Sequence, residues 1–128
     1  MHRESLMPSE RLTFKEMCAR FDVTPRTLRY YEYIELLSPE KEGRSRFYGS
    51  KEIARMTLIL RGRRWGFSLE DVRQWLEIYD QRGTDAQLAN FLELADQQLV
   101  ILEKERVLLE DTIADLSKFR DGIKSSIK

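Results

Sequence analysis

The chain has 128 residues, of which 41% are hydrophobic, and its 22 Lys and Arg residues balance its 22 Asp and Glu residues. This length fits one compact domain, or a small domain plus an extended element, and the hydrophobic fraction is enough for a small core. A charged fraction of 34% suits long solvated helices and a polar binding surface better than a deep enzyme pocket. No apolar run reaches the length of a membrane span and the N-terminus lacks an apolar signal core, so we expect a cytoplasmic protein.

Histidine and cysteine, two residue types that often carry catalysis or bind metal ions, occur once each. The only histidine is His2 and the only cysteine is Cys18, which excludes an intrachain disulfide. The chain has no His–carboxylate or Cys–His pairing and no glycine-rich phosphate loop. We therefore expect no enzyme activity, no cofactor and no metal site, and we expect Cys18 to be a small buried hydrophobic residue.

The charge is distributed unevenly along the chain. Residues 20–64 carry eleven Lys and Arg residues against six Asp and Glu residues, whereas residues 80–128 carry seven against ten. A positive excess within one segment is what a phosphate-binding surface requires. The segment 20–64 is therefore the place to look for a nucleic-acid interface.

Two short helices joined by a tight turn are predicted near the N-terminus. The first covers residues 12–21 and the second about 24–34, with Thr24 as N-cap and Pro25 at the first helical position. The second helix begins with arginines and hydroxyl side chains. This pattern is typical of a helix-turn-helix, whose second helix lies in the DNA major groove.

Several side chains of the second helix can contact DNA, because Arg binds guanine or phosphate and Thr and Tyr bind phosphate oxygens. Arg26 and Thr27 should face the groove, whereas Thr24 has the alternative role of a helix cap alone. We expect Leu28 and Tyr31 in the core, because a buried tyrosine keeps its polar tip at the edge; the alternative for Tyr31 is a DNA contact. The candidate DNA-binding residues of this helix are Thr24, Arg26, Thr27, Arg29 and Tyr30.

A small hairpin, or wing, is expected after the second helix. Proline, glycine and charge stop the helix within residues 38–49, and Arg46-Phe-Tyr48 has the alternation of a short strand. An alternative role for Arg46 is an ion pair with Glu32 or another carboxylate of the same domain. The residues expected near the phosphates or the minor groove are Arg44, Ser45, Arg46 and Lys51.

Residues 50–79 predict a second pair of helices. Ser50 is expected to cap the first of these helices, which ends near Gly66. Ser68 is expected to cap the second helix, with Asp71 at the capping-box position. The winged helix-turn-helix domain with its second helix pair should therefore cover residues 11–79.

Two groups of side chains on this helix pair have two interpretations each. Arg61, Arg63 and Arg64 either cap the helix that they end, through its dipole, or place at least one cation on a phosphate. Trp75 and Tyr79 either pack in the core or line a site for a small-molecule effector. We favour a phosphate contact for the arginines and core packing for the aromatic residues.

A long helix is expected over residues 86–121, after a linker over residues 80–85. Apolar residues repeat every seven positions in two lines, which indicates a coiled coil, and Arg106 interrupts the second line. The rest of the chain is too small to cover this stripe, so we expect a homodimer; the alternative is a helix that folds back on its own domain. The seam residues are Leu88, Ala95, Leu102, Leu109, Leu116 and Ile123 in the first line and Leu92, Leu99 and Ile113 in the second.

The expected fold class is thus mainly α, with flexible ends. A flexible tail should cover residues 1–10 and a C-terminal tail residues 122–128. Between them lie the DNA-binding domain, the linker and the coiled-coil helix. Because the DNA-binding helix is carried by a dimer, the operator should be a pseudo-palindrome.

Four motifs occur in an order and spacing that characterise one family of proteins. They are Thr27-Leu-Arg-Tyr-Tyr-Glu32, Leu36-Leu37 followed by Pro39, Arg46-Phe-Tyr48 and Gly66-Phe-Ser-Leu-Glu70. On these residues the chain resembles the MerR family of bacterial transcription regulators. Glu35 departs from the family pattern, since many members have a glycine there, which accepts a left-handed backbone.

The resemblance implies a winged helix-turn-helix, a second helix pair and an antiparallel coiled coil in a homodimer. It places Arg29 and Tyr30 at positions that touch bases or backbone. It also implies that the dimer bends and untwists promoter DNA and so aligns the promoter elements for RNA polymerase. Family members that sense metals carry cysteines near the ends of the coiled-coil helix, and here no cysteine lies beyond Cys18.

A narrower similarity concerns residues 58–69 and 77–80. These segments resemble MerR-type regulators of branched-chain amino-acid and fatty-acid breakdown, which implies an effector of the acyl-coenzyme A type. Two alternatives stay open. One is a DNA-binding regulator without an effector, and the other is a coiled-coil adaptor whose basic domain binds a protein.

Overall fold

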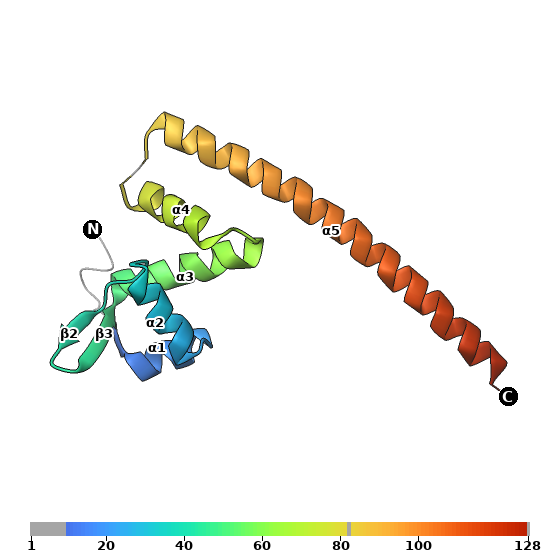
Figure 1. Ribbon diagram of the computed structural model, residues 1–128, viewed down its shortest axis with the longest axis horizontal. Helices are drawn as coiled ribbons and strands as arrows, with labels where there is room; N and C mark the ends of the chain where they lie inside the picture. Colours follow the sequence, from blue (N-terminus) through green and yellow to red (C-terminus); the bar gives the residue numbers. More distant parts are fainter. Residues whose placement is uncertain (1–9, 82, 128) are drawn as a thin grey trace, which may run out of the picture. The chain divides into compact units, whose positions relative to one another are not determined.

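The computed structural model describes residues 10–81 and 83–127, so the expected N-terminal tail, except for Glu10, lies outside the described residues. The chain divides into two units at residues 82 and 83. Within the described residues, the first unit contains four helices and a three-stranded sheet, and the second is one helix (Figure 1). The mainly α architecture agrees with the prediction.

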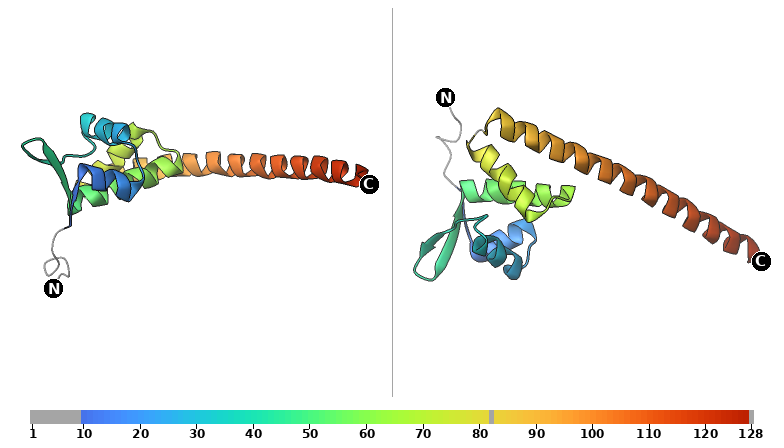
Figure 2. Two further views of the ribbon diagram at one scale, coloured as in Figure 1. Left: turned by 90° about the horizontal axis from the view of Figure 1, so that it is seen from below. Right: turned by 45° about the horizontal axis from the view of Figure 1, so that its top comes forward.

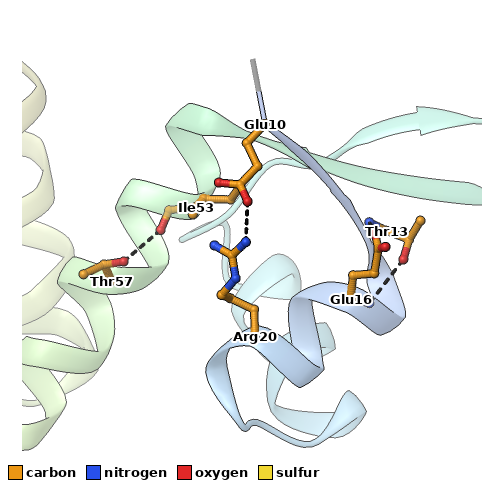
Figure 3. Close-up of polar contacts among 6 residues, drawn as sticks. All are labelled: Glu10, Thr13, Glu16, Arg20, Ile53 and Thr57. Atoms are coloured by element: carbon orange, nitrogen blue, oxygen red, sulfur yellow. Dashed lines mark hydrogen bonds and ion pairs between the residues drawn. The ribbon is translucent and has the colours of Figure 1, made fainter. Parts of the chain in front are cut away.

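The first helix, α1 (Phe14–Phe21), begins two residues later than predicted. Leu12 and Thr13 belong instead to a short strand, β1 (Arg11–Thr13). Thr13 is the N-cap of α1, and its reciprocal bonds with Glu16, of 3.1 and 2.9 Å, form a capping box (Figure 3). The N-cap residue is extended rather than helical, which is why the helix starts only at Phe14.

The second helix, α2 (Pro25–Tyr33), forms as predicted. Thr24 is its N-cap, and the Thr24 hydroxyl accepts a hydrogen bond from the backbone N–H of Thr27 at 3.1 Å. Leu28 and Tyr31 are buried, as expected. The opposite face of the helix is therefore the one that remains for a binding partner.

A hairpin of β2 (Glu40–Glu42) and β3 (Ser45–Gly49) confirms the predicted wing. Gly43 adopts a positive φ of 63° in the turn between the strands, where a Cβ atom would add strain. The wing extends away from the helices in both views of Figure 2. The sequence did not predict that β1 pairs with the other edge of β3, where Leu12 faces Tyr48.

Helix α3 (Ser50–Trp65) begins without a side-chain cap. Its N-cap is Gly49, the last residue of β3, so the prediction that Ser50 caps the helix is wrong. The strand continues directly into the helix, and Ser50 already belongs to the first turn. One turn further on, the hydroxyl of Thr57 donates to the carbonyl of Ile53 at 3.2 Å (Figure 3).

Gly66 ends α3 in the left-handed conformation, with a φ of 96°, as the predicted break requires. Helix α4 (Leu69–Gln81) then begins with Ser68 as its cap, since the Ser68 hydroxyl accepts from the N–H of Asp71 at 3.1 Å. Near the end of α3, Gly62 lets α4 approach closely: a Cβ atom on Gly62 would lie 2.8 Å from Cγ2 of Val72.

The core of the first unit lies between the two helix pairs and the sheet. Each of α1 to α4 contributes at least one buried apolar side chain, as do β1, β3 and the turns after α2 and α3. A core shared by all of these elements explains why the four helices form one unit. Its residues are Leu12, Met17, Leu28, Tyr31, Leu36, Leu37, Tyr48, Met56, Ile59, Phe67, Val72 and Leu76.

The second unit is the single helix α5 (Asp85–Ser126), 42 residues long. Thr84 caps it through a capping box with Gln87, with bonds of 2.8 and 3.2 Å. The expected linker is shorter than predicted, because α4 continues to Gln81. The expected tail from residue 122 is also wrong, because α5 passes through Gly122 and remains helical to Ser126; one glycine costs a helix only about 1 kcal/mol.

Candidate nucleic-acid interface

The exposed face of α2 carries the predicted recognition side chains. Arg26 and Arg29 are exposed, and Tyr30 is half-exposed. Thr27 is partly buried, and its hydroxyl accepts a hydrogen bond of 3.0 Å from the Thr24 hydroxyl. The hydroxyl of Thr24 is thus engaged at the helix start, as the capping alternative states, while Arg26, Arg29 and Tyr30 remain accessible.

The wing carries two exposed polar residues at its tip, Arg44 and Ser45. Arg46 points back into the domain, and its Nε atom lies 3.1 Å from a carboxylate oxygen of Glu32 in α2. The same carboxylate accepts a hydrogen bond from the hydroxyl of Tyr48. The alternative role of Arg46, an ion pair within the domain, is therefore the one that the structure contains.

Phe14, the first residue of α1, joins the wing to the recognition helix. The guanidinium carbon of Arg29 lies 5.3 Å from the centre of the Phe14 ring, and that of Arg46 lies 5.7 Å from it. Both distances are in the range of a cation–π contact. Sequence reasoning did not single out Phe14, because a contact between residues 14, 29 and 46 leaves no local signal.

A basic hollow opens between the start of α1 and the wing. It has a volume of about 200 Å³ and includes the side chains of two exposed cations, Lys15 and Arg44, beside the partly exposed Arg46. The two exposed cations, Lys15 and Arg44, favour an anion such as a phosphate, whereas the charge of Arg46 is already paired with Glu32. The lining residues are Thr13, Phe14, Lys15, Arg44, Ser45, Arg46 and Phe47.

The remaining predicted cations lie at the two ends of α3. Lys51 is exposed in its first turn. At its C-terminal end, Arg63 donates to the carbonyl of Phe67, in the turn that follows the helix, at 2.7 Å. Arg61 lies over the Trp65 ring, 5.2 Å from its centre, and both Arg61 and Arg64 are exposed.

Two family models match this chain. The model described as MerR HTH family regulatory protein matches residues 12–78, and the model described as MerR, DNA binding matches residues 53–121. The chain belongs to the MerR family. The protein is therefore a MerR-family DNA-binding transcriptional regulator.

Three similar proteins illustrate the relationship. The HTH-type transcriptional regulator PA4778 of Pseudomonas aeruginosa is 33% identical over 84% of this chain and 83% of its own length. The HTH-type transcriptional regulator HmrR of Rhizobium leguminosarum is 31% identical over 70% of this chain and 69% of its own length. HiNmlR, a MerR family regulator solved bound to promoter DNA, shares the fold, with a TM-score of 0.65, 19% identity and coverage of 81% and 79% of the two chains.

The relatives of this MerR-family chain are transcriptional regulators, which are not enzymes. In residues 10–81 and 83–127, no three His, Cys, Asp or Glu side chains gather as a metal site would require. Cys18 is partly rather than fully buried. Burial raises the pKa of the Cys18 thiol, against the nearby positive charge of Arg29, which favours the unreactive protonated form.

The two candidate effector residues of this MerR-family protein have different surroundings. Trp75 is partly buried, and its ring centre lies 5.4 Å from that of Trp65, which in turn packs edge-on against Phe67 at 5.9 Å. Tyr79 is 61% exposed, although the sequence favoured core packing for it. Core packing thus describes Trp75 but not Tyr79.

In the second unit, none of the α5 residues, all of which lie in the described part of the chain, is buried. Arg106, which interrupts the predicted seam, forms an ion pair with Glu103 on the same helix. None of the described helices is both long and apolar enough to cross a membrane. Of the predicted seam residues, Leu88, Leu92, Leu99, Leu109, Ile113, Leu116 and Ile123 are exposed, and Ala95 and Leu102 are partly exposed.

Proposed function

We propose that a homodimer of this MerR-family regulator binds a pseudo-palindromic operator, with α2 of each protomer in one major groove. The observation that carries this proposal is the position of Arg26, Arg29 and Tyr30 on the exposed face of a helix whose other face is buried. Arg side chains at such positions read guanine through the major groove. The likeness to HiNmlR, which was solved on promoter DNA, supports the same mode of binding.

The basic hollow beside the wing supplies a second contact, with the sugar–phosphate backbone. Lys15 and Arg44 border it and are exposed, so they can bind a phosphate without breaking an internal ion pair. Arg46 contributes by holding the wing rather than by touching DNA, since Glu32 already engages it. Ser45, Lys51, Arg61 and Arg64 are further candidates for backbone contacts because each is exposed.

Dimerisation takes place through α5. An apolar stripe that repeats every seven residues along a helix with no buried residue requires a partner, and a second copy presents the same stripe. The antiparallel orientation of the two helices follows the family resemblance. The spacing of the two recognition helices then sets the spacing of the half-sites.

Regulation takes place through the shape of the promoter. The dimer bends and untwists the DNA between the half-sites, so that the promoter elements align for RNA polymerase, as the family resemblance implies. Because the energy of such a distortion depends on the DNA sequence, base pairs that the protein does not touch also affect its affinity. A coiled-coil adaptor whose basic domain binds another protein would not distort DNA, so the two proposals predict different results.

The experiment is a selection of fragmented genomic DNA by the purified protein, followed by sequencing of the retained fragments. We expect one inverted repeat, and we expect its affinity to fall in the double variant Arg26→Ala, Arg29→Ala by about 1–3 kcal/mol for each arginine. The control, Lys104→Ala with Lys118→Ala, removes the same charge from exposed positions of α5. Retention of DNA without any shared motif, or equal losses in both double variants, contradicts the proposal.

An acyl-coenzyme A-type metabolite is the effector class that the narrower similarity supports. Trp75 and Tyr79 lie four residues apart on α4, and the exposed ring of Tyr79 offers an apolar contact. Titration of the protein with acyl-coenzyme A compounds of increasing chain length should change its tryptophan fluorescence and its affinity for the operator together. Unchanged operator affinity across the series favours a regulator without an effector.

A further inference from the structure

The turn that follows the recognition helix α2 depends on side chains from outside it. Within the turn, the N–H groups of Leu36 and Leu37 both donate to the carbonyl of Tyr31, at 2.9 and 3.3 Å. Three other polar backbone groups of the turn bond to side chains of other elements. They are the carbonyl of Ile34, the carbonyl of Leu36 and the N–H of Ser38.

Three charged side chains of the second helix pair bind these three groups, so each bond is charge-assisted and stronger than a neutral one. Glu52 is 9% exposed and is the only buried charged residue among those that the structure describes. Burying a carboxylate costs free energy, and the hydrogen bond that Glu52 accepts from the Ser38 N–H offsets part of this cost. The three bonds run from Arg73 of α4 to the Ile34 carbonyl, from Nε of Arg55 in α3 to the Leu36 carbonyl at 3.0 Å, and from the Ser38 N–H to Glu52 at 2.7 Å.

Arg55 makes a second contact at the far end of the helix pair. Its guanidinium also pairs with the carboxylate of Asp80, and the two side chains are 17% and 30% exposed. Asp80 is the penultimate residue of α4, and α5 begins at Asp85. One side chain therefore joins the turn after the recognition helix to the point where the chain leaves the first unit.

We propose that Arg55 is a positioning residue for DNA recognition, which couples the orientation of α2 to the end of α4 through Leu36 and Asp80. This inference rests on the proposed function, because it concerns how a dimer on two half-sites sets their spacing. The chain that leads to α5 leaves α4 directly after Asp80 and Gln81. A change in direction of that chain can therefore reach the turn after the recognition helix through the Asp80–Arg55 pair, in addition to the direct bond from Arg73 of α4.

Neutralising Asp80 should loosen this coupling without touching the DNA-binding side chains. The variant Asp80→Asn keeps the size of the side chain and removes its charge. Its matched control is Glu77→Gln, which makes the same charge change one turn earlier on an exposed position of α4. Arg55→Lys is the second variant, because a lysine keeps the positive charge but lacks the planar group that reaches both partners.

The probe is a set of duplexes that carry the inverted repeat retained by the wild-type protein, with the distance between half-sites varied one base pair at a time. We expect the wild-type protein and Glu77→Gln to prefer one spacing. Asp80→Asn and Arg55→Lys should reduce that preference at least threefold, while their affinity for a single half-site and their dimeric state stay close to those of the wild type. Asp80→Asn, which leaves the bond from Arg55 to the Leu36 carbonyl in place, should also keep a melting temperature close to that of the wild type.

Two results would overturn the inference. In one, Asp80→Asn retains the spacing preference of Glu77→Gln. In the other, both test variants bind all spacings and the single half-site more weakly in parallel with a lower melting temperature, which is the signature of a role in stability alone. A wild-type protein that retains no inverted repeat is a different outcome, since it contradicts the proposed function itself.

Discussion

The Nε atom of Arg46 in the wing lies 3.1 Å from a carboxylate oxygen of Glu32 in the recognition helix. The side chain of Glu32 is only 11% exposed, and it also accepts the hydroxyl hydrogen bond of Tyr48. Arg46, which the sequence suggests as a phosphate contact, therefore forms an ion pair within the domain. Glu32 thus connects the wing and α2, the two elements that we propose to face the DNA.

We predict that Glu32→Gln lowers the free energy of unfolding by about 1.5–3 kcal/mol, the range for hydrogen bonds to charged groups. The substitution keeps the shape of the side chain and removes the charge that Arg46 and Tyr48 share. Urea unfolding followed by circular dichroism measures the change. The control is Glu40→Gln, which removes an exposed carboxylate 3.6 Å from Arg11 and should cost less than about 1 kcal/mol. Equal losses in the two variants would show that the Glu32 network adds nothing beyond a surface pair.

The environment of Tyr48 predicts a loss of stability at alkaline pH. Burial and the hydrogen bond to Glu32 raise the pKa of the Tyr48 phenol well above its ordinary value. The unfolded chain therefore releases this proton first, and the free energy of unfolding should fall as the pH rises above about 10, the unfolded value. Measured by urea unfolding between pH 9 and 11, Tyr48→Phe should show a shallower fall than the wild type. Parallel curves for the two proteins would contradict the prediction.

Glu35 follows the recognition helix with a positive φ of 64°, a conformation that is unfavourable for a residue with a Cβ atom. We predict that Glu35→Gly raises the free energy of unfolding by about 0.5–1 kcal/mol, because relief of this strain exceeds the extra entropy of glycine in the unfolded chain. The reverse substitution at the matching φ of 63°, Gly43→Ala in the wing, should lower it. Thermal unfolding of both variants checks the pair, and a destabilised Glu35→Gly protein would show that the side chain matters more than the backbone.

Gly62 and Gly122 provide a matched pair of helical glycines. A Cβ atom on Gly62 would lie 2.8 Å from Val72, so Gly62→Ala should destabilise the protein by about 1–3 kcal/mol. Nothing lies within 4 Å of a Cβ atom on Gly122, so Gly122→Ala should stabilise α5 by about 0.5–1 kcal/mol. Calorimetric melting temperatures should move in opposite directions. A neutral Gly62→Ala variant would mean that α3 and α4 can separate without cost.

The dimer proposal predicts different effects for two adjacent residues of α5. Leu99 lies on the predicted heptad seam, whereas Val100 does not, and the two are similarly exposed in the single chain, at 62% and 55%. Leu99→Asp should raise the dimer dissociation constant by at least about tenfold, because burial of a leucine contributes about 1.5–3 kcal/mol. Sedimentation equilibrium of both variants measures this. A larger effect for Val100→Asp would place the dimer contact on another face of the helix.

Local signals in the sequence determine where several helices of the chain begin and end. Thr24 and Pro25 predict the start of the recognition helix, Gly66 and Ser68 predict the break between α3 and α4, and both features appear where expected. A cap or a left-handed glycine acts over a few residues, so the sequence contains the whole of the cause. The run Thr13-Phe-Lys-Glu16 is a capping box of the same kind, and this local pattern marks the start of α1 at Phe14.

Tertiary structure decided the contacts between residues that lie far apart in the chain. Strand β1 forms because Leu12 pairs with Tyr48 of β3. Arg46 forms an ion pair within the domain because folding brings Glu32 beside it. An arginine has the same chemistry whether it meets a phosphate or a carboxylate, so only its position in the fold separates the two roles. For the same reason, the sequence gives no signal for the role of Arg55. In the fold, Arg55 connects the turn after the recognition helix to the end of α4.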